Sequence, residues 1–196
     1  MNERSSPLPV RAAPPTVVLT RRDVLKVGAG FAAIAAVATT LGGCGSTSTP
    51  AAQGFSFLQP SDVPLFTALA PAVVSELGNF EEAKRKQLIG QMLQVIDGTL
   101  FAMVQHSQKE VRKLLGLLAV GPLRYALTGV GAWHEADVDK MQAFLARWRG
   151  SRFATLNAGG NVLVKLTASS FYLLPASWPS AGYPGPLDYV FNAINA

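Results

Sequence analysis

The chain has 196 residues, of which 49% are hydrophobic and only 15% are charged, and its formal net charge is +5. This length fits a leader followed by one ordinary domain that can bury a core. The single cysteine excludes an intramolecular disulfide, a thiolate metal cluster and a Cys-x-x-Cys-His haem site. The low charged fraction is typical of a domain that covers part of its surface with a partner.

The net charge does not indicate nucleic-acid binding, because the basic excess lies near the N-terminus. Residues 1–43 contain five of the 17 basic residues but only two of the 12 acidic ones, so residues 44–196 carry +2. A nucleic-acid-binding domain needs a basic stripe on its folded part. We therefore expect no nucleic-acid partner.

Residues 1–43 are organised as an export signal. The segment Thr20-Arg21-Arg22-Asp23-Val24-Leu25-Lys26 precedes fifteen uncharged residues, 27–41, which are fewer than the roughly 20 of a membrane-spanning helix. The segment resembles a twin-arginine signal, with Val24 in place of the usual Phe. The matching residues are Arg21, Arg22, Leu25 and Lys26. The resemblance implies export of a folded protein to the periplasm by the twin-arginine translocase; an uncleaved anchor helix is the alternative.

Leu41-Gly42-Gly43-Cys44 resembles the processing site of a lipoprotein. Cleavage before Cys44 and acylation of its thiol would anchor the protein to a membrane. The alternative is a cysteine that lies by coincidence near an ordinary cleavage site. Residues 44–54 are almost all small or polar and are predicted to form a flexible tether, with order beginning near Phe55.

Residues 55–174 are predicted to form a helical domain. Apolar residues recur with the helical period in five segments, 61–77, 79–104, 107–120, 135–149 and 153–172, and a short helix is expected at 123–127. We find no convincing pair of strands. The prediction is an all-α fold, an irregular bundle of four to five helices.

Several residues predict where these helices begin, bend or end. We expect Ser61 to cap the first helix, Pro71 to kink it and Gly78 to end it. Ser107-Gln108-Lys109-Glu110 reads as a capping box for the third. Segment 135–149 is acidic at its start and basic at its end, as the helix dipole favours. Asn157-Ala158-Gly159-Gly160 predicts a break in the last helix.

Residues 175–196 form a tail rich in Pro, Gly and aromatic residues, which we expect to be extended. One interpretation is a strap that binds a partner, and the other is a tail packed on its own helices. The candidate partner-binding residues are Trp178, Tyr183, Pro184 and Pro186.

No pattern in the sequence predicts catalysis, a cofactor site or a metal site. The two histidines, His106 and His134, lie near no nucleophile motif. Asp137 and Asp139 could join His134 as metal ligands, but residues two apart on a helix do not face each other, and a dipole-matched first turn is favoured. A match to G-x-G-x-x-A at residues 28–33 lies inside the leader and has no preceding strand. The tryptophans favour a core or an interface over cofactor stacking; they are Trp133, Trp148 and Trp178.

Taken together, these features resemble the small subunit of bacterial periplasmic flavoprotein dehydrogenase complexes of the sorbitol, fructose and gluconate dehydrogenase type. The resemblance spans most of the chain, but only the leader is a sharp motif, and the lipoprotein site is a departure from many such subunits. The residues that carry the resemblance are Thr20 to Lys26, Phe57-Leu58-Gln59-Pro60-Ser61-Asp62, Trp178-Pro179 and Gly182-Tyr183-Pro184-Gly185-Pro186.

The resemblance implies a non-catalytic accessory subunit. Such a subunit binds, stabilises and co-exports a large FAD-dependent subunit of the GMC type, often with a cytochrome c subunit. FAD and the substrate would belong to the large subunit, and no catalytic residue is carried over to this chain. The alternative of a different class is a stand-alone periplasmic lipoprotein that acts as an adaptor or scaffold.

Overall fold

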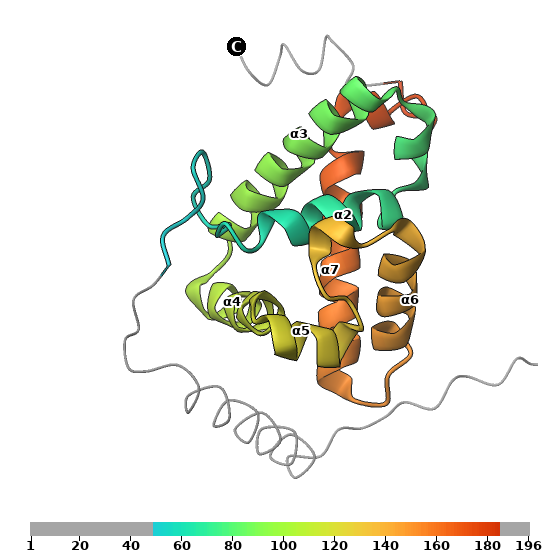
Figure 1. Cartoon of the computed structure of the whole chain (residues 1–196). Helices are drawn as coiled ribbons and strands as arrows, with labels where there is room; N and C mark the ends of the chain where they lie inside the picture. Colours follow the sequence, from blue (N-terminus) through green and yellow to red (C-terminus); the bar gives the residue numbers. More distant parts are fainter. Residues whose placement is uncertain (1–48, 185–196) are drawn as a thin grey trace, which may run out of the picture. The chain divides into compact units, whose positions relative to one another are not determined.

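The computed structural model describes residues 49–184, all of which belong to one compact unit (Figure 1). Within this range the protein is all-α, as predicted, and contains no strand. None of these helices combines the length and the apolar character needed to cross a membrane. The α-helices are α2 (Val63–Val73), α3 (Glu82–Phe101), α4 (Gln105–Ala119), α5 (Gly121–Thr128), α6 (Val138–Arg149) and α7 (Ala154–Tyr172), and the 3-10 helices are η1 (Ser75–Asn79), η2 (Trp133–Glu135) and η3 (Pro175–Ser177).

Helix α2 lies in the middle of the bundle and packs against α3, α6 and α7 (Figure 1). A large hydrophobic cluster surrounds it. Phe144 and Trp148 of α6 meet edge to face there, with ring centroids 5.0 Å apart. This geometry suits the quadrupoles of the two rings. Other members of the cluster are Phe66 and Leu69 of α2, Ile96 and Leu100 of α3, Leu115 and Leu118 of α4, and Leu163 of α7.

A smaller cluster lies where α3 meets the C-terminal end of α7. Its members are Ala70, Val74, Leu77, Leu88, Met92, Phe171 and Leu174. Helix α3 gives Leu93, Ile96 and Leu100 to the large cluster and Leu88 and Met92 to the small one. This two-sided burial explains why the apolar face of α3 is so wide in the sequence.

The predicted limits of the first helix are wrong at both ends. Asp62, and not Ser61, occupies the N-terminal cap position, and Pro64 lies in the first turn. The helix ends at Val73, two residues after Pro71, because Val74 adopts an extended conformation (φ −115°, ψ 92°). The chain then forms η1, which contains Gly78, and both Val74, which lies just before the element, and Leu77 of η1 are buried in the small cluster. Tertiary burial therefore ends this helix earlier than Gly78.

The capping box expected at residues 107–110 does not form. Helix α4 begins at Gln105 with Val104 in the cap position, so Ser107 and Glu110 lie inside the helix. The Gln108 amide donates to the carbonyls of Leu100 (3.2 Å) and Phe101 (2.7 Å). These bonds satisfy the last carbonyls of α3, and Gln108 can make them because α4 begins at Gln105, before the predicted start at Ser107.

Helix α6 confirms the dipole interpretation but begins later than expected. Asp137 accepts a hydrogen bond from the backbone N–H of Lys140 at 2.7 Å and so caps the helix. The preceding residues, Trp133–Glu135, form η2 instead of a first turn. Helix α6 ends at Arg149, before Gly150, as predicted.

Helix α7 is continuous from Ala154 to Tyr172, so the predicted break at residues 157–160 is wrong. Gly159 and Gly160 are buried against α6. An added Cβ at Gly160 would lie 3.1 Å from the Cβ of Trp148, and at Gly159 3.1 Å from the ring of Trp148. The glycines let the two helices approach closely, and this packing outweighs their helix propensity cost of about 1 kcal/mol each.

Candidate functional site

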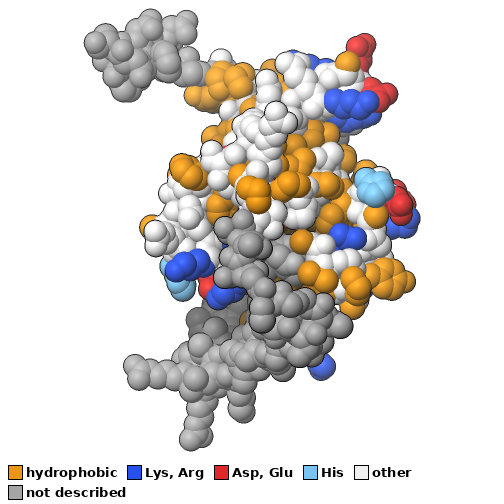
Figure 2. Space-filling model, turned by 60° about the vertical axis from the view of Figure 1, so that its left-hand side comes forward, with side chains coloured by type: hydrophobic (Ala, Val, Ile, Leu, Met, Phe, Trp, Pro, Cys, Tyr) orange, Lys and Arg blue, Asp and Glu red, His pale blue; other side chains and the backbone are white. Residues whose placement is uncertain are grey.

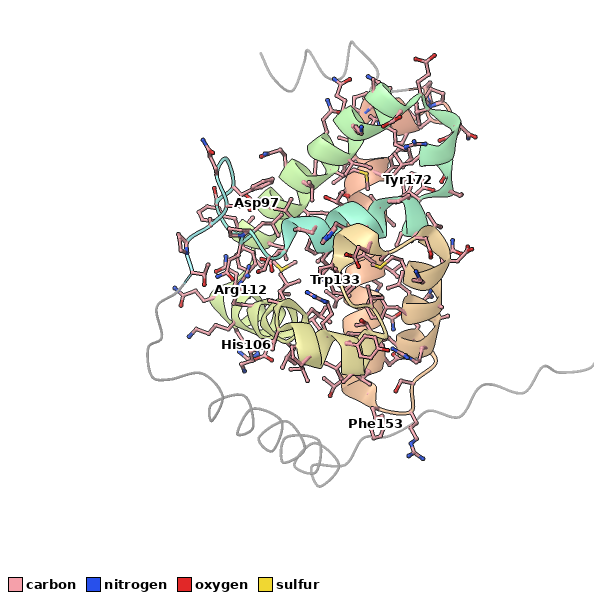
Figure 3. All side chains as sticks on the ribbon, viewed as in Figure 1. Asp97, His106, Arg112, Trp133, Phe153 and Tyr172 are labelled. Atoms are coloured by element: carbon pink, nitrogen blue, oxygen red, sulfur yellow. The ribbon has the colours of Figure 1, made fainter. Side chains whose placement is uncertain are left out.

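Exposed aromatic and apolar side chains gather at the C-terminal end of α7, where the sequence predicts partner binding. Tyr172, Leu173 and Tyr183 are exposed, and Trp178 is half-buried. The rings of Trp178 and Tyr183 meet edge to face with centroids 5.4 Å apart. Figure 3 shows Tyr172 at one end of α7 and Phe153 at the other. We call Tyr172, Leu173, Trp178 and Tyr183 the α7-end surface.

The segment that carries this surface is folded, not extended. The Tyr183 N–H donates to the carbonyl of Trp178 at 2.9 Å, and the Ala181 N–H donates to that of Ser177 at 3.1 Å. Gly182 has φ 67°, which favours glycine. The prediction of an extended tail is therefore wrong for residues 175–184, because small residues and Gly182 allow tight turns that pair the backbone. Pro184 is exposed beside Tyr183.

One hydrogen bond fixes the Tyr172 ring on the adjacent η1. The Tyr172 hydroxyl donates to Oε1 of Glu76 at 2.8 Å. The pKa of Glu76 is lowered, first by its own backbone N–H and next by the Tyr172 hydroxyl. Donation to the Glu76 carboxylate raises the pKa of Tyr172. The bond holds an exposed ring in a defined orientation, which reduces the entropy lost when a partner covers it.

A buried carboxylate on α3 holds the start of the domain, and the sequence analysis missed this role. Asp97 is only 5% exposed. Its Oδ2 accepts the N–H of Ser56, and its Oδ1 accepts the N–H groups of Phe57 and Leu58, each at 2.8 Å. Three charge-assisted bonds compensate the burial of this charge. The signal in the sequence that could have indicated this role is an aspartate within the apolar pattern of segment 79–104.

A second buried carboxylate ties the same segment to α4. Asp62, 2% exposed, accepts the N–H of Gln59 at 2.8 Å and pairs with Nη1 of Arg112 at 2.7 Å. Arg112 also donates to the carbonyl of Phe57 at 3.0 Å, and its guanidinium lies 4.4 Å from the centre of the Phe57 ring. Residues 55–62 are thus held between α3 and α4 by Asp97 and Arg112, which Figure 3 shows on the same side of the molecule.

The folded region extends further towards the N-terminus than expected. The Ala52 N–H donates to the carbonyl of Leu58 at 2.7 Å, and the Phe55 N–H donates to that of Ala52 at 3.0 Å. Gly54 makes the turn between them with φ 82°. Residues 52–58 therefore form a closed loop at the point where the predicted tether enters the domain.

A solvent-open hollow of about 450 Å³ lies between this segment and α4. Its wall combines an aromatic ring with cationic side chains. We call it the basic hollow, and its lining residues are Phe57, Gln108, Lys109, Arg112 and Lys113.

The other candidate residues do not come together in one site. His106 is exposed on α4, whereas His134 is exposed on η2, 3.5 Å from Oε1 of Glu135. Hydrogen bonding from the backbone N–H of Lys140 lowers the pKa of Asp137, in keeping with its capping role. Within residues 49–184, no three His, Cys, Asp or Glu side chains are placed to hold a metal. Trp133 and Trp148 are buried in the large cluster.

Some predicted site residues fall outside residues 49–184 and have no structural description. They are Arg21, Arg22, Leu25, Lys26, Cys44 and Pro186. Comparisons of the chain with protein-family models, with curated proteins and with solved structures find no match.

Proposed function

We propose that this chain is a non-catalytic accessory subunit of a periplasmic oxidoreductase complex. It binds and stabilises a large FAD-dependent sugar or alcohol dehydrogenase subunit of the GMC type and co-exports it by the twin-arginine pathway. One observation carries the proposal: a twin-arginine motif at Arg21-Arg22 precedes a domain that displays exposed aromatic rings at one end. A pathway that moves folded proteins permits a single signal to export two bound chains.

The α7-end surface supports the binding part of the proposal. Tyrosine and tryptophan are enriched at protein interfaces, where they bury large areas with few rotatable bonds. Here Trp178 packs on Tyr183, and Tyr172 is bonded to Glu76, so three rings are already oriented. Binding such a surface costs little conformational entropy. We assign the large subunit to this surface.

The proposal divides the chemistry between subunits. FAD and the substrate belong to the large subunit, and electrons pass from it to a cytochrome c subunit or a quinone. This chain supplies the export signal and, through acylated Cys44, attachment to a membrane. This chain thus determines how much of the large subunit reaches the periplasm and where it is attached, and it takes no part in turnover.

The test is export of the large subunit by a chain with a damaged signal. In cells that express both subunits, we expect Arg21→Lys with Arg22→Lys to reduce flavin-dependent dehydrogenase activity in the periplasm at least tenfold and to leave it in the cytoplasm. Arg4→Lys with Arg11→Lys is the matched control, because it changes two arginines outside the motif. Unchanged periplasmic activity in the first variant would contradict the proposal.

A second experiment separates this function from that of a stand-alone adaptor. The chain is purified from native membranes under mild detergent, and the absorbance spectrum of the eluted fraction is recorded. A co-eluting large polypeptide with a flavin spectrum supports the accessory subunit. A colourless, homogeneous protein supports a lipoprotein adaptor with no flavoprotein partner.

A further inference from the structure

The turn between α3 and α4 presents two bare apolar side chains. Phe101, the last residue of α3, is 60% exposed, and Val104, the residue before α4, is 71% exposed. Their backbones are held by Gln108, whose amide donates to the Phe101 carbonyl and whose N–H donates to the Val104 carbonyl at 3.1 Å. We call these two side chains the α3–α4 corner. It is an ordered apolar projection.

Basic groups lie directly beside this corner. Gln108 also lines the basic hollow, which contains Lys109, Arg112 and Lys113. Arg112 pairs with Asp62 and Lys113 with Glu110, but Lys109 makes no ion pair with any residue that the structure describes. The first turn of α4 has no acidic residue, so the positive end of the helix dipole adds to this charge. Figure 2 shows basic side chains in separate groups on one face of the molecule, with hydrophobic side chains exposed between them.

The described chain also begins at this place. The Gln59 amide donates to the Thr49 carbonyl at 2.9 Å, and the Gln59 N–H donates to Asp62, the partner of Arg112. In Figure 1 the described chain starts on the side of α4. Cys44 precedes Thr49 by five residues, which span at most about 18 Å when fully extended. An acyl chain on Cys44 would hold this side of the domain close to the bilayer.

We propose that the α3–α4 corner and the basic hollow form a surface that binds an anionic membrane. Phe101 and Val104 enter the interfacial layer, where aromatic and aliphatic side chains are favoured. Lys109 and Lys113, both exposed, contact the phosphates of anionic headgroups. The inference deepens the proposed function, because it rests on membrane attachment at Cys44 and gives the attached domain a defined orientation. The α7-end surface then lies on a different part of the fold, free for the large subunit.

The test uses the lack of any other cysteine in the chain. The mature chain from residue 44 is made with Cys44→Ser and Val104→Cys, and the new thiol carries an environment-sensitive nitrobenzoxadiazole dye. Vesicles of phosphatidylglycerol and phosphatidylethanolamine should shift the dye emission to shorter wavelength and raise its intensity severalfold. Pure phosphatidylcholine vesicles should change it little. The control position is Ala83→Cys, exposed near the N-terminal end of α3.

Charge variants complete the test. Lys109→Glu with Lys113→Glu should reduce the response of the Val104→Cys dye at least tenfold, because repulsion replaces attraction to the headgroups. Lys84→Glu with Lys86→Glu makes the same charge change on α3 and should leave the response intact. Circular dichroism spectra show whether each variant is folded.

Two outcomes would overturn the inference. The first is a dye at residue 104 that does not respond to anionic vesicles. The second is a response that appears only when the large subunit is added, since it would assign the corner to a protein contact. The first outcome does not bear on co-export, because that assay contains no partner, no acyl chain and no signal peptide.

Discussion

Arg112 and Asp62 are 50 residues apart in the sequence, yet Nη1 of Arg112 lies 2.7 Å from Oδ2 of Asp62. The same guanidinium holds the Phe57 carbonyl and covers the Phe57 ring. One side chain of α4 therefore fastens the start of α2 and the segment before it. Losing the cation of such a partly buried pair destabilises the fold, because the Asp62 carboxylate stays buried without its partner.

Removing the cation should expose this dependence. We expect Arg112→Met to lower the free energy of unfolding by about 2 kcal/mol, since it leaves the Asp62 carboxylate buried without its partner. Arg112→Lys should lower the free energy of unfolding by a smaller amount, because a lysine keeps the charge, although it lacks the forked set of donors of a guanidinium. Urea denaturation at neutral pH measures both. Equal stability of Arg112→Met and wild type would mean that water replaces the guanidinium at no cost.

Asp97 should matter more than any other single polar side chain that we describe. Asp97→Ala removes the acceptor of three N–H groups, and we expect a loss of about 2–4 kcal/mol. Asp97→Asn keeps one acceptor oxygen and should lose about half as much. Hydrogen exchange should show loss of protection at Ser56, Phe57 and Leu58 before the rest of the domain. Unchanged protection of these amides would contradict the assigned bonds.

The close approach of α6 and α7 predicts opposite effects for two glycine substitutions. Gly160→Ala places a Cβ 3.1 Å from the Cβ of Trp148, which cannot rotate away, and should destabilise the protein by about 1 kcal/mol. Gly90→Ala on α3 has nothing within 4 Å of the new Cβ. It should stabilise the protein by about 0.5–1 kcal/mol through helix propensity. Thermal unfolding distinguishes them, and shifts of the same sign would refute the packing argument.

The Glu76–Tyr172 bond predicts a small dependence of stability on pH. The folded pKa of Glu76 is lowered from 4.5, so its contribution is present above about 4.5 and is lost as pH falls through the folded pKa. The folded pKa of Tyr172 is raised from 10.0, so its contribution is present below that value and is lost as pH rises through the folded pKa. The bond is open to solvent, with Tyr172 exposed and Glu76 half-buried, so Tyr172→Phe should cost only a few tenths of a kcal/mol at neutral pH.

The measurement is the titration of the Glu76 carboxyl carbon by NMR. Tyr172→Phe should raise the pKa of Glu76 only part of the way to 4.5, because the larger cause, its own backbone N–H, remains. Complete return to the ordinary value would show that the tyrosine is the larger cause.

The α7-end surface should bind the large subunit directly. Trp178→Ala with Tyr183→Ala is expected to reduce recovery of the flavoprotein on affinity purification at least tenfold, since hot spots are centred on such rings. Tyr125→Ala is the control, because Tyr125 is an exposed tyrosine on α5. Equal recovery of the flavoprotein with both variants would contradict the assignment of the large subunit to this surface.

Local patterns in the sequence predicted much of the fold. The apolar periods located the helices, and the acidic start, the basic end and the limit at Arg149 that the sequence indicates for segment 135–149 are found in α6. The failures have a common cause, which is that distant contacts override local preference. Val74 leaves the helical conformation to reach the small cluster, and Gly159 and Gly160 stay helical because Trp148 packs on them.

The polar network and the surfaces were less accessible to sequence reasoning. Asp97 binds the backbone of residues about 40 positions away, and backbone N–H groups leave no mark in a sequence. The aromatic residues of the tail were recognisable as interface candidates, but the turn that joins Trp178 to Tyr183 was not. Exposure of Phe101 and Val104 was equally hidden, since apolar residues at that spacing read as helix core.

The three bonds to Asp97 also bear on the order in which the domain folds. The donors lie just after the predicted tether, and the acceptor lies on α3, which is held in the bundle by α2 and α7. A chain whose α3 is not yet packed offers these N–H groups no fixed carboxylate. The loop at residues 52–58 therefore closes only once α3 has packed. Under the proposed export by the twin-arginine pathway, the segment next to the proposed signal is fixed only in a chain that has already folded, which is the state that this pathway moves.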